Sequence, residues 1–208
     1  MKRLGVLLVP VFLGLTAAGE AATAFVHLTL QSPPGEWIGG GQNWDITYTP
    51  SNTVWFYTTL SSDASYLTLN DMMPWTGQDN WLEASFSSTQ LGHPLTTGLY
   101  TDAQRAPFAS PGHPGLDVTF QHRGSNVLTG SFDITELDYH ESDGSWVVDD
   151  FDASFTQYSD FEPQPLTGTI TYCAATPEPA TLLAMSIGAG AFLARRRRVA
   201  VVRPRSGS

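Results

Sequence analysis

The stretch Asp150-Phe-Asp-Ala-Ser-Phe-Thr156 decides the fold class, because its apolar and polar residues alternate strictly. Phe151, Ala153 and Phe155 fall on one face of an extended chain, and the residues between them fall on the other. A period of two, with one packed face and one solvated face, is typical of a strand in an antiparallel sheet. We therefore expect residues 150–156 to form a β-strand that covers a core on one side.

The same pattern recurs along most of the chain. Further stretches that alternate, or that are rich in β-branched and aromatic residues, are residues 25–30, 44–48, 54–60, 66–69, 81–86, 116–120, 131–134 and 166–172. Between the phase shifts at 135–136 and 149–150, Ser142-Asp-Gly144 predicts the turn of a hairpin. No stretch before Pro177 has the 3.6-residue period of an amphipathic helix. The prediction is an all-β ectodomain, an antiparallel β-sandwich or jelly-roll-like fold over residues 25–175.

The N-terminus has the layout of a secretory signal peptide. Lys2 and Arg3 precede an apolar stretch, residues 4–15, and small residues then lead to Ala22-Thr-Ala24. This A-x-A tripeptide is the pattern that signal peptidase cleaves. We expect residues 1–24 to direct export through the Sec translocon and the mature chain to begin near Phe25.

The C-terminus carries three parts in close order. They are Thr176-Pro-Glu-Pro179, an apolar run at 180–194 and the cluster Arg195-Arg-Arg-Arg198. As a helix, the run would span roughly 22 Å, which is less than the ~30 Å of a bilayer core, so it predicts a transmembrane helix that holds only briefly or with help. The arginines and the tail 199–208 should stay cytoplasmic, which places residues before Pro177 on the other side.

This arrangement resembles the PEP-CTERM sorting signal of Gram-negative bacteria over residues 176–198. The matching positions are Pro177, Glu178, Pro179, Arg195, Arg196, Arg197 and Arg198. The resemblance implies a short-lived anchor in the inner membrane and removal of the signal by an exosortase, a membrane cysteine transpeptidase. It also implies a final place at the cell surface or in the biofilm matrix, in hosts that usually make exopolysaccharide. An ordinary C-terminal anchor that stays in place is the alternative.

Charge separates the two signals from the domain between them. Eight of the ten basic residues lie in the signals, so residues 25–176 keep only Arg105 and Arg123 against 18 of the 20 carboxylates. A net charge near −16 repels nucleic acid and anionic lipid, and it attracts divalent cations or basic partners. The alternative is that the acidity simply keeps a secreted domain soluble and dispersed.

Residues from about 80 to 172 resemble a secreted bacterial β-sandwich domain of unknown function. The motifs that carry this resemblance lie at residues 95–100, 105–108, 114–116, 123–126, 130–134, 151–157 and 166–172. Relatives carry cysteines where this chain has Ser125 and Ser159, which implies that the two positions pair across the sheet. Cys173 is the only cysteine, so it has no partner for an internal disulfide.

The sequence predicts no catalytic residue. No serine stands in a Gly-x-Ser-x-Gly elbow, and none of the five histidines has a neighbour at metal-ligand spacing, so we expect no zinc site. The alternative function is a secreted, glycosidase-like hydrolase that uses a carboxylate pair. Its candidate carboxylates are Glu136, Glu141, Asp149, Asp150 and Asp152.

Two kinds of binding site remain open. Oxygen ligands on a hairpin suit calcium, and the alternative is a simply solvated acidic hairpin. The calcium candidates are Glu141, Asp143, Asp149, Asp150 and Asp152. Trp37 and Trp75 lie in predicted loops, where an exposed ring could stack on a sugar, whereas Trp55 and Trp81 lie in predicted strands and should be core. We expect a non-catalytic surface protein that associates with exopolysaccharide.

Overall fold

The computed structural model describes residues 24–49, 56–71, 81–160 and 162–174. All of them belong to the unit Thr23–Thr176. The predicted signal peptide up to residue 23, the predicted membrane helix and the arginine cluster lie outside these ranges, as do Trp55 and Trp75. Within the described ranges, no helix has the length and apolar character needed to cross a bilayer.

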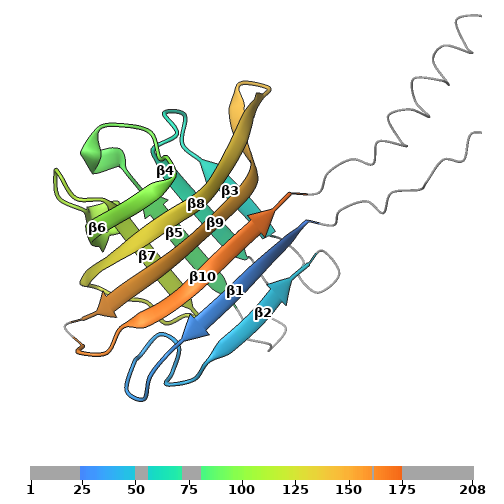
Figure 1. Ribbon diagram of the computed structural model, residues 1–208. Coiled ribbons are helices and arrows are strands. Elements are labelled where there is room, and N and C mark those ends of the chain that lie inside the picture. Colours follow the sequence, from blue (N-terminus) through green and yellow to red (C-terminus); the bar gives the residue numbers. More distant parts are fainter. Residues whose placement is uncertain (1–23, 50–55, 72–80, 161, 175–208) are drawn as a thin grey trace, which may run out of the picture. The chain divides into compact units, whose positions relative to one another are not determined.

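The described residues form ten β-strands and two single-turn 3-10 helices (Figure 1). The strands are β1 (Phe25–Gln31), β2 (Trp44–Tyr48), β3 (Phe56–Leu60), β4 (Tyr66–Asp71), β5 (Leu82–Ser87), β6 (Gly98–Arg105), β7 (Gly115–Phe120), β8 (Leu128–Ser142), β9 (Ser145–Ser159) and β10 (Leu166–Cys173). The helices are η1 (Thr89–Leu91) and η2 (Ala106–Phe108). The all-β prediction is confirmed.

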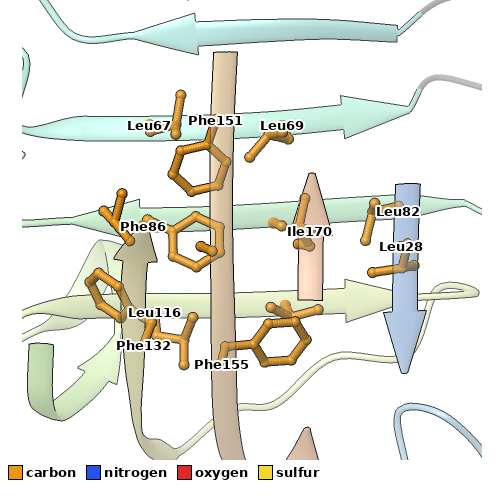
Figure 2. Close-up of a cluster of buried hydrophobic side chains, with 14 of the residues drawn as sticks. Leu28, Leu67, Leu69, Leu82, Phe86, Leu116, Phe132, Phe151, Phe155 and Ile170 are labelled. Atoms are coloured by element: carbon orange, nitrogen blue, oxygen red, sulfur yellow. The ribbon is translucent and has the colours of Figure 1, made fainter. Parts of the chain in front are cut away.

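The ten strands form one sheet in the order β2-β1-β10-β9-β8-β6-β7-β5-β4-β3. All pairs are antiparallel except the short β6–β7 pair. The sheet folds over at β6, so that β2, β1, β10, β9 and β8 form one layer and β7, β5, β4 and β3 form the other (Figure 1). Figure 2 shows the strands of the two layers crossing, with the core side chains between them. The result is a β-sandwich.

Aromatic rings at the centre of the core join the layers. The Phe86 ring of β5 lies 5.3 Å from the Phe132 ring of β8 and 5.1 Å from the Phe151 ring of β9 (Figure 2). Phe151, Ala153 and Phe155 are all buried, as their alternation predicts. Each large side chain that is fully buried in this way contributes about 1.5–3 kcal/mol relative to an exposed one.

The longest hairpin joins β8 and β9. Its two turn residues, Asp143 (φ +52°) and Gly144 (φ +78°), are both left-handed, as a type I′ turn requires. The register shifts between Ile134 and Glu136 and again between Asp138 and Tyr139, where Asp149 is the extra residue on β9. Both bulges coincide with the phase shifts in the sequence.

The chain enters and leaves the sandwich at the same end. Phe25, the first residue of β1, pairs with Cys173, the last residue of β10, and Cys173 pairs on its other side with Asp150. The Ala174 N–H then donates to Asp149 O at 2.7 Å. The connections β1–β2, β7–β8 and β9–β10 therefore lie at the opposite end (Figure 1).

Candidate functional site

A buried carboxylate fixes the connection between β1 and β2. Glu36 is 2% exposed. Its oxygens accept hydrogen bonds from Ser32 Oγ (2.6 Å) and from the N–H groups of Ile38 and Gly39 (2.7 Å each). A buried carboxylate with three donors is satisfied within the protein. Glu36 was not among the candidates from the sequence, and its role is to hold this loop in one shape.

Trp37 extends from the fixed loop into solvent. Its side chain is 54% exposed. Among the described residues it is the one exposed tryptophan: Trp44, Trp81 and Trp146 are half-buried. Trp44 shows the contrast, since its Nε1 donates to Gly39 O at 2.9 Å and its ring lies edge-on to Phe120 at 5.2 Å. A flat apolar ring held in water suits stacking on the apolar face of a sugar.

Arg123 lies beside Trp37, although the two are far apart in the sequence. Its Cζ is 5.9 Å from the centroid of the indole. Its Nη2 donates to Gln121 Oε1 at 2.8 Å. The guanidinium also lies against Gly40, where an added Cβ would come 2.7 Å from Nη1 and where φ is +68°. Glycine at position 40 thus makes room for the guanidinium and accommodates the left-handed backbone.

The connection between β9 and β10 completes this end of the sandwich. Glu162 Oε2 accepts a long hydrogen bond from Trp37 N–H at 3.3 Å. Asp160 Oδ1 accepts from the N–H groups of Asn126 and Val127 at 3.0 and 2.9 Å. These bonds link the three connections to one another. We refer to Trp37, Gln121, Arg123 and Glu162 as the Trp37 site.

The structure spreads the five calcium candidates along the β8–β9 hairpin. Glu141 and Asp143 are exposed near the turn, Asp149 Oδ2 lies 2.7 Å from His140 Nδ1, and Asp152 Oδ1 accepts from Thr171 Oγ1 at 3.3 Å. Carboxylate oxygens of Glu136, Asp138 and Asp150 instead lie within 4.8 Å of one another. Only Asp150 belongs to the predicted calcium set, and the bulges are the reason, since they shift which residues share a face. Calcium binding at the hairpin stays a prediction.

Two carboxylates on the other layer have perturbed acidity. Burial raises the pKa of Asp117 on β7, and the hydrogen bond and charge of Arg105 offset part of this effect. Arg105 Nε donates to Asp117 Oδ2 at 3.0 Å. Burial also raises the pKa of Glu83 on β5, with a further contribution from the charge of Asp117. Neither was a candidate from the sequence, because alternation shows which face a residue occupies but not how deeply that face is covered.

A comparison with protein families identifies the C-terminal segment. Residues 175–198 match the family model described as the PEP-CTERM protein-sorting motif. No significant match was found among curated proteins or among solved structures. The chain therefore carries the sorting signal of an exosortase substrate and is exported to the cell envelope or surface.

Proposed function

We propose that the ectodomain is a non-catalytic module that associates with exopolysaccharide at the cell surface or in the biofilm matrix, and that Trp37 is its sugar-binding platform. The observation that carries the proposal is the exposed indole of Trp37 on a loop whose backbone is fixed by the buried Glu36. A rigid platform loses little conformational entropy when a ligand binds. An exported protein also meets the exopolysaccharide of its own cell.

A single stacked sugar supports only weak binding, and the proposed setting compensates for this. A polysaccharide repeats its units, and many copies of a surface protein face the same polymer. Linked binding events raise the overall affinity by orders of magnitude without any new contact. A single exposed indole such as that of Trp37 is therefore sufficient for retention in a matrix.

A hydrolase with a carboxylate pair is the second candidate function. It is favoured by Glu136 and Asp150, whose carboxylate oxygens lie within 4.8 Å of each other. Retaining glycosidases hold their two carboxyl groups about 5–5.5 Å apart. However, Glu136 is exposed on the outer face of the sheet, and a general acid needs an enclosed site that keeps it protonated near neutral pH. We therefore rank binding above hydrolysis.

The test is retention of the ectodomain, residues 25–176, on exopolysaccharide purified from the producing organism. We expect Trp37→Ala to weaken retention by about tenfold or more, since it removes the platform. Phe108→Ala is the matched control, because Phe108 is also an exposed aromatic with an arginine over its ring, and we expect it to bind like the wild type. Unchanged retention of Trp37→Ala would contradict the proposal.

The same samples test the hairpin. We expect no release of sugar from the polymer, and equal retention by Glu136→Gln and Asp150→Asn. Sugar release that both variants abolish would instead support the hydrolase. Repeating the assay with calcium and then with a chelator tests the calcium prediction: calcium-dependent retention that Asp150→Asn abolishes would locate the ion on the β8–β9 hairpin.

A further inference from the structure

Positive charge is scarce in this domain, and the two arginines that provide it are in different situations. Arg105 donates to Asp117 at 3.0 Å, so its charge is neutralised. Among the described residues, no carboxylate oxygen lies within 4.0 Å of a guanidinium nitrogen of Arg123, which is the limit for an ion pair. The acceptor of its Nη2 is the neutral amide of Gln121. A cation without a counterion is unexpected among 18 carboxylates.

The guanidinium of Arg123 is also held in place. Gln121 binds one end of it, and Gly40 leaves the space that it fills. Its distance of 5.9 Å from the Trp37 centroid is at the outer limit of a cation–π contact, so the ring does not replace a hydrogen-bond acceptor. Its Nε is buried and has no acceptor in the described part of the chain. Because a ligand cannot reach a buried Nε, the groups left for it are the Nη atoms beside the exposed ring, of which Nη2 already donates to Gln121.

We propose that the Trp37 site binds an acidic sugar, with the ring stacked on Trp37 and its carboxylate held by Arg123. This inference rests on the proposed function and names the class of saccharide. A planar guanidinium presents parallel N–H groups that match the two oxygens of a carboxylate, whereas a neutral hydroxyl takes only one of them. A uronic acid supplies both the ring and the carboxylate in one unit.

The charge of the whole domain gives the interaction an unusual salt dependence. A net charge near −16 repels an acidic polymer at long range, while the contact at Arg123 attracts it at short range. Salt of about 0.1 M screens charges that lie more than roughly 10 Å apart, and it affects a close pair less. Binding is expected to strengthen as salt rises from low to moderate concentration, and to weaken only beyond that.

The test compares binding of the ectodomain to polygalacturonate and to the same polymer after reduction of its carboxyl groups. We expect about tenfold tighter binding to the acidic form, because one charge-assisted, two-pronged contact is lost on reduction. Arg123→Gln should abolish this preference, so that the variant binds the acidic and the reduced polymer equally. Arg123→Lys, which keeps the charge but loses the planar fork, should retain only part of the preference for the acidic polymer.

Arg105→Gln is the matched control, because it removes the same charge from an arginine that is already paired with Asp117. We expect it to keep the preference for the acidic polymer. Equal binding to both polymers, or a preference that survives in Arg123→Gln, would overturn the inference while leaving the proposed function intact. If the wild-type ectodomain bound no polysaccharide, including the native exopolysaccharide, the proposed function itself would be refuted.

Discussion

Gln157 is a polar residue whose side chain is fully buried in the core. Its Oε1 accepts from Val118 N–H at 2.9 Å, and its Nε2 donates to Val118 O at 3.0 Å. Strand β6 pairs with β7 only at Gly115 and Leu116, so these backbone groups of Val118 lie beyond the reach of that ladder. The amide of Gln157 takes the place of a strand neighbour and links the two layers.

Replacing Gln157 should therefore be costly. Gln157→Leu introduces an apolar side chain of similar size and leaves one buried N–H and one buried C=O of Val118 without partners. We expect the free energy of unfolding to fall by about 2–4 kcal/mol, since each orphaned group costs about 1–3 kcal/mol. Urea denaturation measures this, with Gln104→Leu on β6 as a less buried control. A loss below about 0.5 kcal/mol for Gln157→Leu would contradict this role.

The stability of the fold depends on pH through the ionisation of Glu83. Burial and the charge of Asp117 raise its pKa in the folded state, so the folded protein binds this proton more tightly than the unfolded chain does. The contribution to stability is thus complete below the unfolded pKa, near 4.5, and is lost as pH rises through the folded pKa.

Glu83→Gln should remove the loss of stability that accompanies ionisation of Glu83 at higher pH. We expect the variant to unfold at a higher urea concentration than the wild type at pH 7, and the difference to disappear near pH 4. The gain should stay below about 1 kcal/mol, because solvent screens a side chain that is only partly buried. Urea midpoints of both proteins at the two pH values measure it. A gain of equal size at pH 4 would show that the charge of Glu83 is not its cause.

At the scale of elements, period-two alternation located nine of the strands but missed β6. The burial of β6 does not alternate, because its register slips between Tyr100 and Ala103 and Asp102 has a φ of +58°. The outer parts of β8 and β9 were missed for a different reason. They pair with each other beyond the body of the sheet, so both of their faces are largely exposed and the apolar signal fades.

Ser125 and Ser159 lie on two neighbouring segments at the end of the sandwich opposite the Phe25–Cys173 pair. Both are 2% exposed, and Ser159 Oγ has no hydrogen-bond partner in the described part of the chain. Asp160 N–H donates to Val127 O at 2.8 Å, which holds the two segments together just beyond the serines. A disulfide needs Cα atoms about 4.4–6.8 Å apart, so it can join only segments that lie this close together.

We expect Ser125→Cys combined with Ser159→Cys to form a disulfide without disturbing the fold. Closing a loop of about 35 residues should stabilise the domain by roughly 4 kcal/mol on the chain-entropy account. Thiol titration and the thermal midpoint with and without reductant measure the two effects. Free thiols that persist after oxidative refolding would contradict the pairing and the resemblance on which it rests.

At the scale of the whole molecule, local sequence order predicted the sorting signal, while the Trp37 site was only half predictable. The signal is a continuous stretch, and residues 175–198 match its family. Trp37 was visible as a loop tryptophan, but Arg123 and Glu162 reach it from connections far along the chain. Those connections come together through the pairing of β1 with β10, of β10 with β9 and of β9 with β8.

Removal of residues 176–208 should change where the protein is found. Without the sorting signal, the exported chain cannot be processed by the exosortase, so we expect it to leave the envelope fraction. Fractionation of producing cells followed by immunoblotting measures the distribution between envelope, matrix and medium. Trp37→Ala in the full chain is a useful comparison, because it should change retention in the matrix but leave processing intact. An unchanged distribution after the deletion would refute sorting through this signal.

The pairing of Phe25 with Cys173 gives the domain a direction. A chain attached through its C-terminus is attached at the end of the sandwich where β10 finishes. The eight residues of β10 would then separate the point of attachment from the Trp37 site by about 26 Å. In a chain attached in this way, the sheet would act as a spacer that sets the height above the envelope of the loops with the Trp37 site, where we propose that sugar binds. Lengthening β1, β9 and β10 together, with every residue of the Trp37 site unchanged, would extend the depth of polymer that the domain can sample.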